Sequence, residues 1–94
     1  MKNLLKVGDE VNVTDDSYSM IKTKKGICHL AETRGYLQNR NPWKIITFAE
    51  GLPADNSSHR LGIGDKQYND VIIQHSIGIV ASTQKRFLMK GGLR

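Results

Sequence analysis

Two residue types that often carry catalysis or metal binding stand side by side at Cys28 and His29. A cysteine paired with a histidine base can act as a nucleophile, and sets of Cys and His bind zinc. Adjacent residues of a strand point to opposite faces, however, so this pair is poorly placed for either task. No Cys-x-x-Cys or His-x-x-x-His spacing adds His59 or His75 as further ligands. We therefore expect Cys28 to be a chemically quiet core residue, and we expect no metal, no cofactor and no enzymatic activity.

A second group of reactive residue types lies in a polar stretch. Asp55, Ser58 and His59 resemble a hydrolase triad only in composition, because triads are assembled from separate rigid elements and no Gly-x-Ser-x-Gly motif is present. Gly62-Ile63-Gly64 is a fragment of a dinucleotide-binding motif that lacks the third glycine, the preceding strand and the following helix. Both groups are better explained as parts of a polar loop.

The most informative stretch for function is residues 34–44, which mixes cations, amides and two aromatic residues. Single-stranded nucleic acid is bound by this combination, since cations contact phosphates while rings stack on bases. We expect Arg34 and Arg40 to pair with phosphates and Tyr36 to offer a stacking face. Trp43 begins a strongly apolar segment, and we expect it in the core.

The positive charge is concentrated in two segments. Fourteen Lys and Arg residues oppose nine acids, for a net charge of +5, and residues 22–44 and 85–94 carry +5 and +4 while the rest is mildly acidic. If both segments fold onto one face, they form a positive track that attracts polyanions. The alternative is a solvated basic surface without a ligand. The residues expected to form the track, together with Tyr36, are Lys22, Lys24, Lys25, Arg34, Arg40, Lys44, Lys85 and Arg86.

Composition excludes several other classes. The apolar content of 38% is too high, and the net charge too low, for a disordered chain. The longest apolar run is three residues, far short of a membrane span, and the first residues lack the features of a signal peptide. A single cysteine fits a reducing compartment. We expect a cytoplasmic protein that is a monomer or a weak dimer.

The elements that must position these residues are strands. Apolar residues alternate with polar ones over residues 5–13, so we expect Leu5, Val7, Val11 and Val13 to share the buried face of one strand, with a bend at Gly8-Asp9. Residues 43–49 are rich in β-branched and aromatic types, and residues 71–75 and 79–81 flank a tight turn at 76–78.

No segment shows helical periodicity over ten residues. Five to six short strands with long loops, including the polar connection 51–69, favour an all-β, small, partly open barrel. We expect residues 1–90 to form this single domain and residues 91–94 to form a flexible basic tail.

The string Lys6-Val7-Gly8-Asp9-Glu10-Val11-Asn12-Val13 resembles the first strand of SH3-like barrels, including the KOW type of ribosomal and transcription proteins. Together with residues 15–19 and 83–88, it also resembles small phage- and prophage-encoded proteins of unknown function. The resemblance implies an SH3-like barrel and a phage origin, and it implies no activity.

Two functions follow as hypotheses. The first is a non-catalytic module that contacts nucleic acid through residues 22–44 and 85–94. The alternative is a protein–protein adaptor that acts on a host or virion partner. Phosphate binding weakens steeply with salt, whereas a mostly apolar protein contact does not, so salt dependence separates the two.

Overall fold

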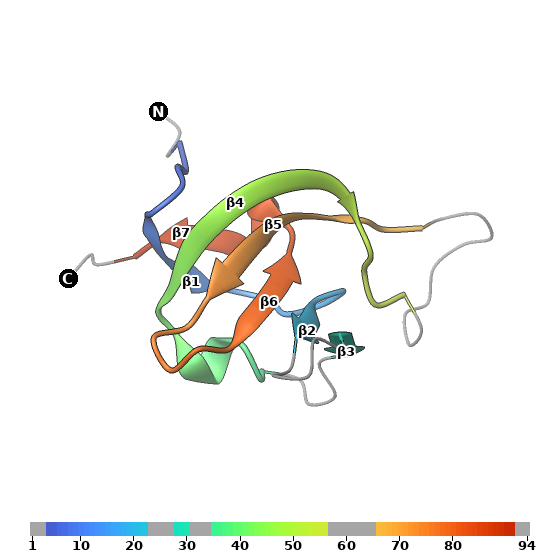
Figure 1. Ribbon diagram of the computed structural model, residues 1–94, viewed down its shortest axis with the longest axis horizontal. Coiled ribbons are helices and arrows are strands. Elements are labelled where there is room, and N and C mark those ends of the chain that lie inside the picture. The colour runs from blue at the N-terminus through green and yellow to red at the C-terminus, as the bar shows by residue number, and fades with distance from the viewer. Residues whose placement is uncertain (1–3, 23–27, 31–34, 57–65, 92–94) are drawn as a thin grey trace.

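The chain folds into one antiparallel β-sheet with short helical turns, seen in a computed structural model that describes residues 4–22, 28–30, 35–56 and 66–91 (Figure 1). The expected all-β class is confirmed, and the described residues form seven strands. The strands are β1 (Glu10–Val13), β2 (Met20–Lys22), β3 (Cys28–Leu30), β4 (Trp43–Leu52), β5 (Asn69–Gln74), β6 (Val80–Thr83) and β7 (Leu88–Lys90). Two 3₁₀ turns complete the elements, η1 (Gln38–Arg40) and η2 (Lys85–Phe87). No helix in the described part of the chain is long and apolar enough to cross a membrane.

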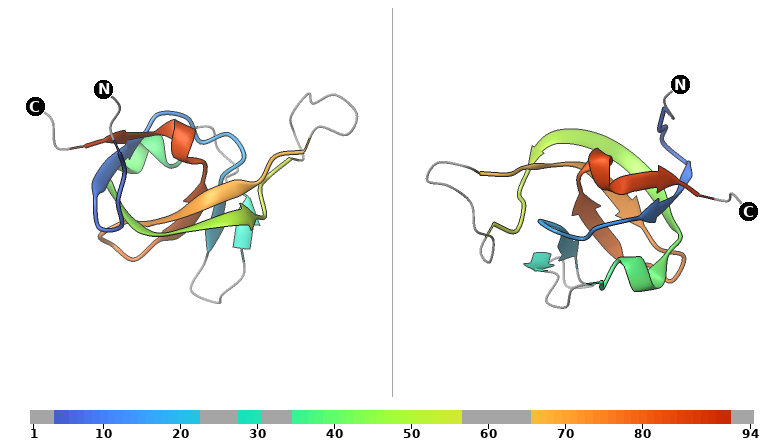
Figure 2. Two further views of the ribbon diagram at one scale, coloured as in Figure 1. Left: turned by 90° about the horizontal axis from the view of Figure 1, so that it is seen from above. Right: turned by 180° about the vertical axis from the view of Figure 1, so that it is seen from behind.

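Strand β4 is the longest element and gives the sheet its curvature. It pairs with β1 at one end and with β5 along most of its length, in the sheet order β3-β2-β6-β5-β4-β1-β7. Its register against β5 shifts between Ile45 and Thr47 and again between Phe48 and Leu52. Such irregularities bend a strand and increase its twist, and the sheet curls around its core (Figure 2). Within the described residues β3 and β7 end the sheet, so hydrogen bonds do not close it.

The core lies on the concave face of this sheet. Its buried apolar residues are Val11, Val13, Ile21, Leu37, Trp43, Ile45, Val71, Ile73, Ala81 and Leu88. Trp43 is 1% exposed, and its indole Nε1 donates a 2.9 Å hydrogen bond to the carbonyl oxygen of Leu37. A buried indole needs such a partner, and the expectation that Trp43 belongs to the core is confirmed.

The first strand is shorter than the alternation indicates. Gly8 adopts φ +94°, and its N–H donates to the carbonyl oxygen of Ile45 at 2.8 Å, so the expected bend at Gly8-Asp9 is confirmed. The bend interrupts the alternation, because β1 begins only at Glu10. As a result Val7 is 60% exposed, and the expectation that it shares the core face of Val11 and Val13 is wrong.

The second half of the chain follows its expected order. Strands β5 and β6 form a hairpin in which the His75 N–H donates to the Ile79 carbonyl oxygen at 2.8 Å. After η2, β7 returns to pair with β1, and the Gly91 N–H donates to the Glu10 carbonyl oxygen at 2.7 Å. Residues 57–65 of the polar connection 51–69 and residues 92–94 of the tail lie outside the described residues.

Candidate nucleic-acid interface

The first basic segment contributes three described site residues near one another. Lys22 is exposed at the end of β2, and Tyr36, half-buried before η1, lines the same hollow of about 400 Å³. Arg40, in η1, contacts Tyr36 directly. Lys24, Lys25 and Arg34, which were expected beside them, lie outside the described residues.

Arg40 and Tyr36 are already bound to each other. The guanidinium carbon of Arg40 lies 3.9 Å from the centroid of the Tyr36 ring, and Arg40 Nη1 donates a 3.0 Å hydrogen bond to the Tyr36 carbonyl oxygen. Tyr36 also packs against the core. Arg40 therefore covers one face of the Tyr36 ring. A base that stacked on this ring would have to use the other face.

Lys44 occupies a separate position. It is exposed on β4, directly across from Glu10 of β1 in the register. The hollow beside it is lined by a different set of residues, including His75, whose ring makes an edge contact with Trp43 at 5.2 Å between centroids. A carboxylate on the neighbouring strand makes this a less favourable phosphate site.

The second basic segment lines a groove that we call the basic groove, with a volume of about 680 Å³. Lys85 and Arg86 of η2 form one part of its wall, and Lys90 of β7 forms another. The half-buried ring of Phe48 lies among them. The remaining lining residues are Leu4, Leu5, Leu88 and Met89. Among the described residues that line the groove there are three cations and no carboxylate.

The cations on η2 are oriented by their neighbours. Lys85 Nζ lies 5.5 Å from the centroid of the Phe48 ring. Arg86 Nε donates to Gln84 Oε1 at 2.6 Å, and its guanidinium also lies over the Phe87 ring at 4.6 Å. Both side chains remain exposed. The charges are thus held at the groove while they stay accessible to a ligand.

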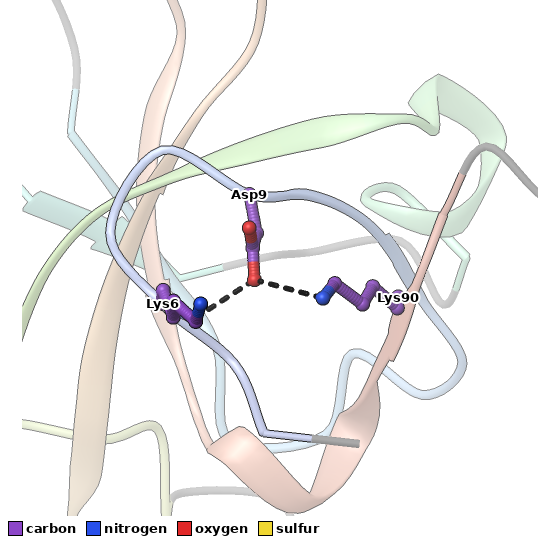
Figure 3. A network of polar contacts seen from close by, with 3 residues as sticks. All are labelled: Lys6, Asp9 and Lys90. Carbon is purple, nitrogen blue, oxygen red and sulfur yellow. Dashed lines mark hydrogen bonds and ion pairs between the residues drawn. The ribbon is translucent and has the colours of Figure 1, made fainter.

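The third cation is anchored by a small polar network (Figure 3). Asp9 Oδ2 accepts a 2.8 Å hydrogen bond from the backbone N–H of Lys6 and lies 3.7 Å from Lys90 Nζ. The Lys90 side chain is 42% exposed, against 21% for Asp9. Asp9 therefore fixes Lys90 at the edge of the basic groove and offsets part of its charge.

The described residues of the two basic segments line different hollows. The basic groove shares no lining residue with the hollow of Lys22 and Tyr36. In Figure 1 η1 (green coil) lies at the lower side of the view, and η2 (orange-red coil) lies near the top, behind β4 and β5. The sequence could not place the segments relative to each other, because this placement depends on how the sheet curls.

The basic groove includes residues that the sequence did not indicate. Lys90 belongs to the segment 85–94 but was not expected at the site, and Phe48 was expected only as a strand residue. Lys90 follows the apolar residues Leu88 and Met89, and this position at the end of a strand could have marked it as a site residue. Nothing local indicated Phe48, because the register shift that turns it toward the groove comes from pairing with β5.

The described residues contain no group of three or more His, Cys, Asp and Glu that could hold a metal ion. His59 and Ser58 lie outside the described residues, as do the side chains of Cys28 and His29. No protein-family model matches the chain, and no curated protein or solved structure is significantly similar to it.

Proposed function

We propose that this chain is a non-catalytic, SH3-like barrel module that binds nucleic acid at the basic groove. One observation carries the proposal: Lys85, Arg86 and Lys90 line one groove together with the Phe48 ring, and the described lining residues of this groove include no carboxylate. Cations supply contacts to phosphates, and an aromatic ring supplies a surface for a base.

The fold supports the SH3-like part of the proposal. A single antiparallel sheet curls around one core, and the last strand β7 pairs with the first strand β1. The 3₁₀ turn η2 makes the connection between β6 and β7. A phage or prophage origin is a hypothesis that rests on the sequence resemblance.

A single strand suits this groove better than a duplex. The Phe48 ring is half-buried within the groove, so only an unstacked base can reach it. The neighbouring Leu88 and Leu5 give the groove an apolar surface that a base contacts more favourably than a phosphate does. In a duplex the bases are stacked on each other, and only backbone phosphates would meet the three cations.

The test compares two triple variants with equal reductions in charge. Lys85→Ala/Arg86→Ala/Lys90→Ala removes the groove cations, and Lys22→Ala/Lys44→Ala/Lys66→Ala removes three exposed lysines elsewhere. Binding of a labelled oligothymidine and of a duplex is measured by fluorescence anisotropy at two salt concentrations. For the single strand, each phosphate interaction that a variant removes lowers the slope of log K against log salt by about 0.7.

We expect the groove variant to lose affinity and salt dependence, and the control variant to keep most of both. An equal loss in the two variants would mean that net charge, not the groove, attracts the oligonucleotide. Absence of binding to either oligonucleotide at low salt would overturn the proposed function.

A further inference from the structure

A second surface of the molecule is apolar where a sheet normally faces water. It begins on the outer face of β2, β6 and β5 and continues around the end of β2 to Tyr36, and we call it the apolar strip. Two hollows of about 120 and 400 Å³ meet on it, and both are lined by Lys22 and Val80. The smaller hollow is also lined by Met20, Leu52, Pro53 and Ile72, and the larger one by Ile21, Tyr36, Ile77 and Ile79.

The strand register shows that these side chains form adjacent rows. Lys22 of β2, Val80 of β6 and Gln74 of β5 are direct partners across three strands. The next row contains Met20 and Ile72, with Ser82 between them. The residues that alternate with these rows, Ile21, Ala81 and Ile73, are buried in the core. The smaller hollow therefore lies on the outer face of these three strands, whereas the larger one lies where β2 ends and β6 begins, and the core-side residues Ile21, Tyr36 and Ile79 line it.

The core cluster of the described residues does not include Met20, Ile72 or Val80. Antiparallel sheets usually place polar side chains on the face opposite the core, yet Ile72 and Val80 face outward here. At the hairpin turn Ile77 is 70% exposed. Met20, Ile72 and Val80 are half-buried. An apolar surface that a fold leaves partly open to water is a candidate interaction site.

The charge of the apolar strip differs from that of the basic groove. Lys22 is the one charged side chain among the described residues that line the two hollows, and it stands where they meet. An apolar partner that covered Lys22 without a carboxylate would leave a desolvated cation, which is costly. A partner with one acid at this point supplies the missing charge and fixes its own register.

We propose that the apolar strip binds a peptide segment of a partner protein in which one Asp or Glu is flanked by apolar residues. The acid pairs with Lys22 Nζ, and the apolar side chains on either side enter the two hollows, one of them beside the Tyr36 ring. This interaction is separate from nucleic-acid binding at the basic groove. A chain that binds at both sites connects the partner protein to the nucleic acid.

The two other candidate occupants fit less well. Nucleic acid needs several cations along its backbone, and the described lining of the strip offers one. A second copy of the chain placed face to face would bring Lys22 against a surface whose described lining residues include no acid.

The first experiment identifies what the strip prefers. The chain is immobilised and used to select binders from a display library of random twelve-residue peptides. Enriched peptides are expected to share one acid between apolar residues. Enrichment of peptides that lack an acid, or no enrichment, overturns the proposal.

The second experiment locates the contact on Lys22. Affinities of a selected peptide and of its Glu→Gln or Asp→Asn form are measured by anisotropy against the natural chain and Lys22→Gln. Each single change is expected to weaken binding about tenfold, which corresponds to about 1.4 kcal/mol, and the double change is expected to add little more. Lys44→Gln, an exposed lysine outside the strip, is expected to have no effect. Additive effects of the two single changes overturn the pairing with Lys22.

The third experiment separates this proposal from the proposed function. The variant Lys85→Ala/Arg86→Ala/Lys90→Ala is expected to bind the peptide normally. Val80→Ser is expected to lose peptide binding and to bind oligothymidine normally, and circular dichroism checks that this variant is folded. Displacement of oligothymidine by the peptide overturns the separation of the two sites. If the chain forms a dimer at high concentration and Ile77→Ser dissociates it, the strip binds a second copy of the chain. That result also overturns the proposal.

Discussion

The guanidinium carbon of Arg40 lies 3.9 Å from the centroid of the Tyr36 ring, and the same side chain hydrogen-bonds the Tyr36 carbonyl oxygen. This arrangement ties η1 to the segment that enters it and to the core against which Tyr36 packs. Arg40 thus has a structural task that competes with phosphate binding.

Replacing Arg40 tests which task dominates. We expect Arg40→Ala to lower the free energy of unfolding by about 0.5–1 kcal/mol, the usual range for an exposed cation–π pair, and to change oligothymidine affinity little. Urea denaturation and anisotropy titrations measure the two effects. In a double-mutant cycle with Tyr36→Leu, the stability effects should not add. If Arg40→Ala lost as much oligothymidine affinity as Lys85→Ala does, Arg40 would be part of the nucleic-acid interface.

Phe48 tests the stacking contribution in the basic groove. Phe48→Leu keeps an apolar side chain but removes the ring, so we expect single-strand binding to weaken by about 1–3 kcal/mol and duplex binding to remain nearly unchanged. Tyr68→Leu, which removes a ring that is 53% exposed outside the groove, is the control. Equal losses for the single strand and the duplex would show that the ring does not stack on a base.

Asn69 is a buried polar residue that joins three parts of the fold. Its side chain is fully buried, and Nδ2 lies within hydrogen-bond distance of the Tyr18 carbonyl oxygen (2.9 Å), the Pro53 carbonyl oxygen (3.2 Å) and Ser82 Oγ (3.0 Å). Removing it takes one donor away from each of these acceptors, of which the Tyr18 carbonyl oxygen also accepts from the Asp55 N–H at 2.9 Å.

We expect Asn69→Ala to cost about 1–3 kcal/mol of unfolding free energy, measured by urea denaturation. Asn69→Asp should cost more, because it removes the donor and buries a carboxylate. Ser82→Ala, which removes one acceptor and leaves the other two, is the milder control. A stability loss for Ser82→Ala as large as that for Asn69→Ala would contradict the central role given to the amide.

Asp9 couples the β1 bend to the basic groove. Asp9→Asn keeps an oxygen that can accept the Lys6 N–H, while it removes the negative charge beside Lys90. We expect this variant to bind oligothymidine more tightly, by about 0.2–1 kcal/mol, the range of an exposed ion pair. Asp9→Ala should bind similarly but unfold more easily, because the hydrogen bond at the bend is also removed. Unchanged affinity in both variants would place Lys90 outside the binding surface.

Local pattern was sufficient for the strand content. Side chains of a strand alternate between two faces, so the apolar positions of β1, β5 and β6 indicate strands directly, and Gly78 marks the turn between the last two. The core position of Trp43 followed from the apolar segment that it begins. These features depend on residues that are adjacent in the sequence, so they can be predicted without knowledge of the fold.

Tertiary structure decided which residues meet at a surface. A simple alternation from Trp43 places Phe48 on the side of Lys44 and Ile46, but the register shift against β5 pairs Phe48 with Val71 and turns it toward the core side and the basic groove. The return of β7 beside β1 brings Lys90 to the same groove, and the curl of the sheet keeps Tyr36 and Arg40 at a separate hollow. Strand pairing between residues far apart in the chain fixes these positions. Charge and periodicity along the chain do not predict that pairing, because they describe only residues that are close in sequence.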